Sequence, residues 1–180
     1  MYLTQGVLAA LFDRETGQHA GEQLIVLNEA EQEFTCDGHA SAPVLSINRQ
    51  FTAPVAIARD ISRDDLVFLA AHDDDAFARH ESMQELLLTF LLGDGEDASR
   101  EAIGTAAGAI LADDMLDHEM RAELLTLPPF AYLGERSKIY DPGAMVEKRR
   151  FSLEPSTRNP SVSRLLSNRV RALSCNFLSK

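Results

Sequence analysis

Residues 60–72 have the sequence DISRDDLVFLAAH, and the hydrophobic pattern of the chain changes here. Upstream, apolar residues alternate with polar ones, which is typical of strands. From Ser62 onward the period is 3.6 residues, and Asp65 follows Ser62 as in a capping box with Asp in place of Glu. This stretch therefore predicts β structure up to residue 60 and a helix from Ser62. The apolar stripe of that helix consists of Leu66, Leu69 and Ala70.

Five short runs upstream of this point have the composition of strands, because they are rich in Val, Ile, Leu and Phe. Turn residues separate them: Asp13–Gly17 is predicted to form a hairpin loop, and Asp37–Gly38 a tight turn. Pro43 and Pro54 are expected at strand starts or sheet edges, since proline has no N–H to donate. We expect an antiparallel segment with few strands for a closed sandwich. The expected strands are Val7–Phe12, Gln23–Leu27, Glu33–Cys36, Val44–Ile47 and Val55–Ala58.

The pattern downstream predicts helices that pack as an antiparallel bundle. Gly93–Gly95 would end the second of them, and Asp141–Pro142 would start the fifth, with an N-cap followed by proline. In the third, Gly104, Gly108 and Ala112 recur every fourth residue and form a flat strip on which another helix can lie close. The other four helices are expected from Ser62, over about Asp75–Leu92, over about Ser99–Ala112 and over about Asp117–Leu125.

Composition limits the classes of partner. The chain has 180 residues, 45% of them hydrophobic, with a net charge of -11 and a pI near 4.8. Nucleic-acid partners are not expected, because proteins that bind them concentrate Lys and Arg. A membrane is not expected either, since no uninterrupted apolar run approaches the roughly 20 residues of a span. The start lacks the basic region and cleavage site of a signal peptide, and Cys36 and Cys175 form no C-x-x-C pair. We therefore expect a cytoplasmic protein.

The last region differs in charge from the rest. From Lys148 to the end there are eight basic residues and one acidic, a net of +7, so residues 1–147 carry -18. One interpretation is a basic tail that binds an anionic partner or the acidic face of its own chain. The other is a change of reading frame near Arg149 or Arg150, which would make the tail an unselected sequence. We therefore expect three regions, a β domain over 1–60, a helical domain over 61–148 and an atypical tail over 149–180.

Several stretches over residues 7–148 resemble bacterial aminopeptidase N, a zinc metalloaminopeptidase of the gluzincin group, in both order and spacing. The clearest are Ala122–Pro128, with the sequence AELLTLP, and Ile139–Pro142, with the sequence IYDP. The others are Leu11–Asp13, Leu27–Phe34, Phe51–Val55, Asp64–His72, Asp75–Arg79 and Gln84–Leu87. None of them is a catalytic motif. After Arg150 the similarity is expected to stop, where the charge balance inverts.

The resemblance implies a fold of mixed class, β followed by α. The β part would be the later strands of an Ig-like β-sandwich, and the helices would begin a large superhelical C-terminal domain. In the family that helical domain covers the active site of a hydrolase that removes N-terminal amino acids from peptides. The resemblance therefore implies that the chain is scaffold and active-site cover, with zinc and peptide substrates belonging to the parent enzyme.

The catalytic residues of that family are not found in the sequence. Zinc there is held by H-E-x-x-H and a distant Glu, because two imidazoles one helical turn apart and a carboxylate complete the ligand set. His80-Glu81 is followed by Gln84, and His118-Glu119 by Ala122, where the second histidine would stand. The G-x-M-E-N segment that holds a substrate's amino terminus is also missing. We therefore assign no catalytic, cofactor-binding or metal-binding residue and expect no cofactor in this chain.

Weaker candidates have ordinary structural explanations. The acidic residues Asp64, Asp65 and Asp73–Asp75 do not have the spacing of a calcium loop, and acidic residues near helix starts are expected to be solvated or to interact with the macrodipole. His72, at a helix end, is expected to interact with the last carbonyls of the helix. Cys36 is expected to occupy a buried strand position and not to act as a nucleophile, because no partner base is evident.

Two hypotheses remain. The chain is either an inactive segment of an aminopeptidase N or a free-standing interaction or regulatory module derived from that family. Both predict possible self-association, because a sandwich that lacks strands leaves sheet edges unpaired.

Overall fold

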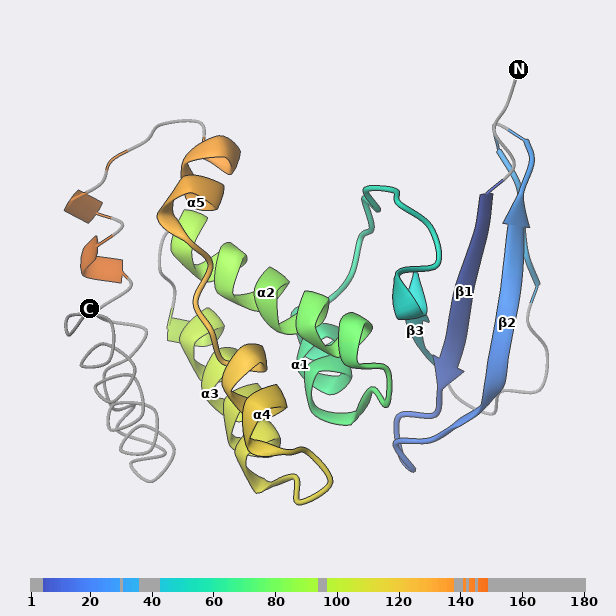
Figure 1. Cartoon of the computed structure of the whole chain (residues 1–180), viewed down its shortest axis with the longest axis horizontal. Helices are drawn as coiled ribbons and strands as arrows, with labels where there is room; N and C mark the ends of the chain where they lie inside the picture. Colours follow the sequence, from blue (N-terminus) through green and yellow to red (C-terminus); the bar gives the residue numbers. More distant parts are fainter. Residues whose placement is uncertain are drawn as a thin grey trace. The chain divides into compact units, whose positions relative to one another are not determined.

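The computed structural model describes residues 5–29, 31–35, 43–93, 97–137, 141, 143–144 and 146–148. The chain divides into two compact units, Met1–Ser82 and Met83–Lys180. Three strands followed by helices are drawn in Figure 1. The predicted class, mixed with β before α, is therefore confirmed.

The first unit contains an antiparallel sheet of three strands in the order β2-β1-β3. Its strands are β1 (Gln5–Phe12), β2 (His19–Leu27) and β3 (Val44–Ile47). Strands β1 and β2 form a hairpin, in which the Asp13 carboxylate accepts backbone hydrogen bonds from Glu15 and Thr16 at 3.0 and 2.8 Å. Gly17 has φ of 69°, a conformation that favours glycine, so the expected turn chemistry is present.

The register places alternate residues of the strands on opposite faces of the sheet. Ala10 pairs with Ser46 and Phe12 with Val44, so these four side chains share one face. A register shift between Ala10 and Phe12 in the β1–β2 ladder marks a bulge, after which Phe12 pairs with His19.

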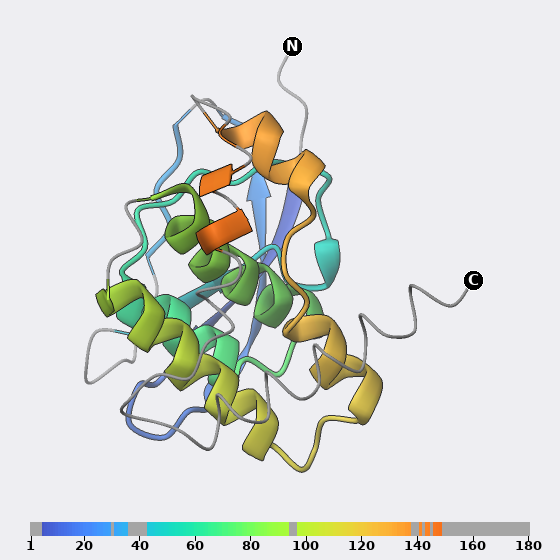
Figure 2. The same ribbon diagram turned by 90° about the vertical axis from the view of Figure 1, so that its left-hand side faces the viewer.

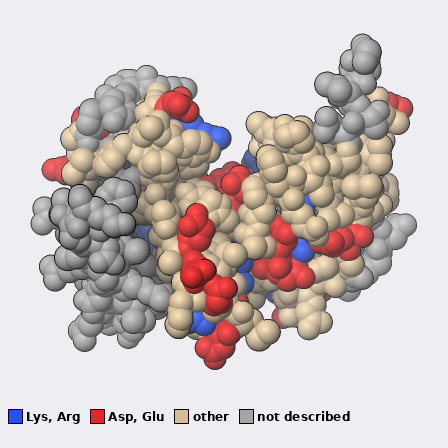
Figure 3. All heavy atoms as spheres, in the orientation of Figure 1, with Lys and Arg blue, Asp and Glu red and all other residues tan. Residues whose placement is uncertain are grey.

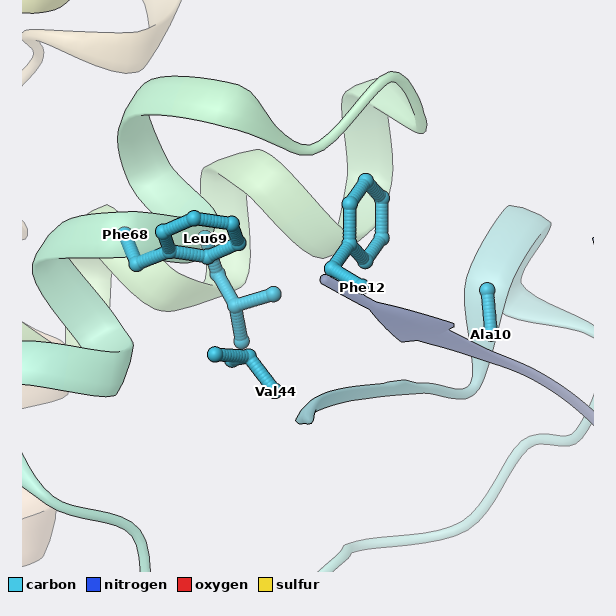
Figure 4. Packing of buried hydrophobic residues seen from close by; sticks show 5 residues of the cluster. All are labelled: Ala10, Phe12, Val44, Phe68 and Leu69. Atoms are coloured by element: carbon cyan, nitrogen blue, oxygen red, sulfur yellow. The ribbon is translucent and has the colours of Figure 1, made fainter. Parts of the chain in front are cut away.

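The hydrophobic core of the first unit forms where helix α1 (Arg63–His72) packs on that face. Ser62 caps the helix as predicted, because its hydroxyl oxygen accepts the N–H of Asp65 at 3.1 Å. Figure 4 shows Phe12 and Val44 of the strands beside the residues from the helix. The buried cluster consists of Ala10, Phe12, Val44, Phe68 and Leu69, with Ile61 packed against it.

Helix α2 (Ala76–Leu92) runs from the first unit into the second, which also contains α3 (Asp97–Ala112), α4 (His118–Leu124) and α5 (Phe130–Arg136). These helices are seen from a second direction in Figure 2. The buried apolar residues of the second unit are Met83, Leu86, Leu87, Phe90, Leu91, Ala102, Ile103, Ala106, Ala107, Ile110, Leu124 and Leu133. No helix among the described residues is long and apolar enough to cross a membrane.

Two of the five predicted strands are wrong over the residues described. Residues 33–35 and 55–58 have no regular structure, and Cys36 lies outside the described residues. A strand needs a neighbour for its hydrogen bonds, and neither segment has one within the described part of the sheet. Val55 and Ile57 are exposed at 37% and 38%, so their apolar pattern marks no buried face.

Helix α5 is absent from the prediction. Pro128 and Pro129 indicate a helix end, but Pro129 is also the N-cap residue of the next helix. The spacing of the apolar residues Phe130 and Leu133 was the available signal for this helix, since it is helical and Leu133 is fully buried in the structure. The expected fifth helix is found where described, since residues 143–144 and 146–148 are helical after Asp141. The carboxylate of Asp141 accepts the N–H groups of Gly143 and Ala144 at 2.9 and 3.2 Å.

The flat strip expected on α3 is not in close contact at Gly104. A Cβ added there would meet no atom within 4 Å. The buried side of α3 consists instead of Ser99, Ala102, Ile103, Ala106, Ala107 and Ile110. The close helix approach predicted from the glycine spacing is therefore wrong at Gly104, because this residue lies outside the buried stripe of the helix.

Candidate functional site: a buried arginine in the first unit

The most unusual polar residue of the first unit is Arg49, which is only 2% exposed. It begins the short 3-10 helix η1 (Arg49–Phe51) directly after β3. Asn48, Gln50 and Phe51 have positive φ values of 59°, 57° and 52°. Non-glycine residues in this region cost on the order of 1–3 kcal/mol each, so other interactions must hold the turn in place.

The side chains of Asn48 and Asp75 hold this turn. The Asn48 side-chain amide donates to the carbonyl of Ala53 at 3.0 Å, and its oxygen accepts the N–H of Ala53 at 2.9 Å. The Asp75 carboxylate accepts the N–H of Gln50 at 3.1 Å. The turn is thus closed on itself and tied to the start of α2.

The guanidinium group of Arg49 is bonded on all three nitrogens. Nε donates to Glu22 Oε1 of β2 at 2.7 Å, and one terminal nitrogen donates to Asp73 Oδ1 at 2.7 Å and to Ser46 Oγ at 3.3 Å. The other terminal nitrogen donates to Asp74. The Arg49 side chain therefore links two strands to the connection between α1 and α2. We call Arg49, Glu22, Ser46, Asp73 and Asp74 the Arg49 cluster.

Charged side chains cap the two helix ends that meet at the connection between α1 and α2. Asp75 Oδ1 accepts the N–H of Ala78 at 2.8 Å in the first turn of α2. Arg79 donates to the carbonyls of Ala70 and Ala71 at the end of α1, at 2.8 Å each. Because the first four N–H and last four C=O groups of a helix have no partner inside it, these contacts satisfy groups that the sharp connection would leave unpaired.

The pKa values in the cluster follow from burial and charge. Burial by itself lowers the pKa of Arg49, but hydrogen bonds to Glu22 and Asp74 and the charge of Asp73 raise it above its ordinary value. Burial raises the pKa of the Asp73 carboxyl, against hydrogen bonds from Ser46 and the Asp75 backbone and the charge of Arg49. Burial also opposes ionisation of Asp74, but hydrogen bonds from Arg49 and His19 lower the pKa of that carboxyl.

This arrangement is suited to holding elements together and not to proton transfer. Asp74 is bonded to Arg49 and lies 3.2 Å from His19 Nε2, and Glu22 is bonded to Arg49. Asp73 has a side chain with no exposed surface, and its Oδ2 has no hydrogen-bond partner. The Asp73 side chain therefore offers no exposed surface to a substrate. The cluster is therefore a structural tie whose central pair, Arg49 and Asp73, is buried.

Sequence reasoning missed this cluster. The acidic residues Asp73–Asp75 were expected to be solvated or to interact with a helix macrodipole, but Asp73 is 1% exposed and pairs with Arg49. Asp75 does cap α2. The available signal was a charged residue, Arg49, inside an otherwise apolar and turn-forming segment, because a buried Arg requires carboxylate partners. Most other carboxylates lie at the surface, and Figure 3 shows more Asp and Glu than Lys and Arg on one face.

The two His-Glu pairs lie on helices of the structure. His80 is partly buried on α2 with its Nδ1 3.8 Å from Glu81 Oε1. Gln84, at the position where a second ligand would stand, donates through its side-chain amide to the carbonyl of Thr126 at 2.9 Å. His118 and Glu119 are exposed in the first turn of α4. Among the residues that the structure describes, neither pair belongs to a group of three or more side chains that could hold a metal ion.

Two further expectations concern single residues. The expected contact of His72 with helix carbonyls is replaced by a ring contact, because its imidazole lies 5.0 Å from the Phe68 ring. Cys36 and Cys175 lie outside the described residues. Within the ranges that are described, no group of three or more His, Cys, Asp or Glu side chains could hold a metal ion. The described residues therefore do not fit the zinc of the parent family.

Comparison with known families accounts for both parts of the chain. Residues 6–60 match a family model described as a domain of unknown function (DUF3458) with an Ig-like fold. Residues 63–155, more than half of the chain, match a model described as a domain of unknown function (DUF3458_C) with ARM repeats. The chain belongs to the DUF3458_C family. The match ends five residues beyond Arg150, the position at which the similarity was expected to stop.

Curated relatives of this family member confirm the resemblance to aminopeptidase N. The chain is 31% identical to aminopeptidase N of Escherichia coli over 142 residues, which are 75% of the chain and 16% of that protein. It is 32% identical to aminopeptidase N of Caulobacter vibrioides over 127 residues, 68% of the chain and 15% of that protein. The chain thus spans about a sixth of the length of these relatives and corresponds to a part of an aminopeptidase N.

A solved structure agrees with the fold of this family member. Aminopeptidase A of Legionella pneumophila, crystallised in complex with aspartic acid, superposes with a TM-score of 0.74. The match covers 94% of the chain and 19% of that structure, at 24% identity. An Ig-like part followed by ARM-like helices is therefore the architecture of the chain.

Proposed function

We propose that the chain is a non-catalytic segment of a zinc-dependent aminopeptidase N that acts as scaffold and active-site cover for the parent enzyme. The parent would remove N-terminal amino acids from peptides. Alone, the chain neither binds zinc nor hydrolyses peptides.

The similarity to aminopeptidase N supports the assignment to that enzyme. It extends over 75% of the chain but only 16% of the Escherichia coli protein. The H-E-x-x-H motif that such an enzyme requires is not found in the printed sequence. This combination, a peptidase relative without the residues that bind its metal, is the observation that carries the proposal.

The Arg49 cluster supports the scaffold role. It ties β2 and β3 to the connection between α1 and α2 within the first unit, so the Ig-like strands and the first helices form one connected body there. ARM-type repeats are stabilised by contacts with neighbouring repeats, and a fixed first helix pair gives such a stack a defined start. The chemistry of this segment would thus be mechanical support.

Self-association is the second part of the proposal. Large apolar side chains remain exposed on the described strands, including Leu24 at 59%, Val26 at 41% and Leu45 at 44%. Exposed apolar surface next to a sheet edge promotes association of strands. We therefore propose that the isolated chain associates through its sheet.

Zinc content and hydrolysis test the catalytic part of this proposal. The purified full chain, washed free of loosely bound metal, is expected to contain less than about 0.1 zinc per chain by elemental analysis, because it lacks the ligand set. It should release no product from an alanyl substrate, while complete Escherichia coli aminopeptidase N in the same assay serves as positive control. Stoichiometric zinc, or hydrolysis that persists after contaminating host peptidases are removed, would overturn the proposal.

A further inference from the structure

The two edges of the sheet are protected to different degrees. Strand β3 has four residues, follows Pro43 and ends at the η1 turn, whereas β2 has nine residues. Sheet edges in stable proteins are usually blunted by short strands, prolines or charged residues. Strand β2 contains no proline, and from Gln23 to Leu27 its sequence is QLIVL without a charge. The β2 edge is therefore the less protected of the two.

Backbone groups on β2 point out of this edge. The N–H of Leu8 donates to the Thr52 hydroxyl at 2.9 Å and therefore points away from β2. Leu8 pairs with Leu24, so this pair is the non-hydrogen-bonded type, and Leu24 also directs its N–H and C=O away from β1. Because the pattern repeats every second residue, Glu22 and Val26 do the same. Among the described residues no further strand lies beside β2 to accept these groups.

The side chains at the same positions leave apolar surface open. Leu24 and Val26 are 59% and 41% exposed and lie on the sheet face that carries Ala10. Leu24 leans over Gly6, where an added Cβ would lie 3.3 Å from its Cδ1. An exposed apolar stripe therefore runs alongside the outward backbone groups.

We propose that two copies of this chain pair through their β2 strands, antiparallel and with Leu24 on the two-fold axis. This deepens the self-association proposed above by naming the edge and the register. Strand β2 of the second copy then pairs with the β2 edge of the first, so that the two sheets form one continuous antiparallel sheet.

The register follows from charge and from the direction of the backbone groups. With Leu24 opposite Leu24 of the second copy, Glu22 lies opposite Val26, so the two carboxylates are not adjacent. In this register the pairs Leu24–Leu24 and Glu22–Val26 are of the hydrogen-bonded type. The outward N–H and C=O groups of Glu22, Leu24 and Val26 therefore all obtain partners in the second copy. A two-fold axis on Glu22 would instead place two carboxylates face to face. The pairing is thus self-complementary, as a two-fold interface requires.

Matched lysine substitutions on the two edge strands test the interface. Leu24→Lys places two ammonium groups opposite each other, so the dimer dissociation constant from sedimentation equilibrium should rise by at least about tenfold. Leu45→Lys, on β3 at 44% exposure, is the control and should change it by less than about twofold. Far-UV circular dichroism verifies that both variants retain the fold.

Hydrogen exchange of the unmodified chain gives a second readout that needs no variant. As the protein concentration is raised through the dimerisation range, the amides of Leu24 and Val26 should become protected, because they enter intermolecular hydrogen bonds. A concentration-independent monomer would overturn the inference, as would a dimer that Leu45→Lys disrupts and Leu24→Lys does not. Neither result bears on zinc binding or hydrolysis, so this test fails independently of the scaffold assignment.

Discussion

The two ends of one sheet face differ in burial although both carry apolar side chains. Phe12 and Val44 are each 1% exposed, whereas Leu24 and Val26, on the same face of β2, are 59% and 41% exposed. The covered end lies under Phe68 and Leu69 of α1. Leu24 and Val26 are not members of that buried cluster. The alternation of apolar residues thus selects the face, and a tertiary partner decides whether that face is buried.

The covered end is also where the first unit buries charge. Ser46 lies on this face beside Val44, and its hydroxyl accepts from Arg49, which in turn binds Asp73 at 2.7 Å. At the open end, neither residues 5–8 of β1 nor residues 23–27 of β2 include a charged side chain. Dense packing and a buried ion cluster therefore occur together, because a charge that loses water must find fixed partners.

The largest effect is expected from a substitution that removes the buried cation of Arg49. Arg49→Met should lower the free energy of unfolding by about 3–5 kcal/mol, because Asp73 is left as a buried charge without its partner. Urea denaturation measures the change. The matched control is Arg14→Met, which removes an ion pair to Asp65 whose side chains are 45% and 25% exposed. It should cost no more than about 1 kcal/mol, and equal losses in the two variants would contradict the distinction.

A second test compares the same residue type at both ends. Leu69→Ala, at a residue 1% exposed in α1, should destabilise by about 2–5 kcal/mol through lost burial and a cavity. Leu24→Ala, at 59% exposure, should stay within about 0.5 kcal/mol of the unmodified chain. Denaturation at a protein concentration low enough to keep the chain monomeric gives both values. A large loss from Leu24→Ala would show that the open end is packed after all.

The smallest expected effect concerns the loss of stability at acidic pH. Because the pKa of Asp74 is lowered in the folded chain, its ionised form stabilises the fold above the unfolded value of about 3.9, and this stabilisation is lost as pH falls through the folded pKa. Asp74→Asn should therefore make the fall in stability below about pH 4 shallower. Thermal unfolding followed from pH 6 to pH 2 measures the slope. An acid limb identical to that of the unmodified chain would contradict the role of Asp74.

Local sequence signals were sufficient to predict the elements whose hydrogen bonds join residues close together in the chain. Helix α1 was predicted from Ser62, and its cap and its buried Leu66 and Leu69 are present in the structure. The hairpin of β1 and β2 was predicted from its turn, because loop residues such as Gly17 set the register of the two strands that they join.

Features that depend on distant partners could not be predicted in the same way. Residues 55–58 have the composition of a strand but no neighbouring strand with which to pair in the described sheet. The Arg49 cluster joins residues 22, 46, 49, 73 and 74, and no local pattern indicates that these separated positions meet. The family resemblance was predicted from the order and spacing of stretches such as AELLTLP, none of which is a catalytic motif.

The left-handed turn around Arg49 constrains how this segment can change during evolution. Replacing Arg49 alone leaves a buried carboxylate uncompensated, and replacing Asp73 alone leaves a buried guanidinium without one of its partners. Each single step is therefore costly, whereas a joint exchange for apolar residues need not be. Positions 49 and 73 should accordingly show strong epistasis, and descendants of this sequence would keep both residues or lose both.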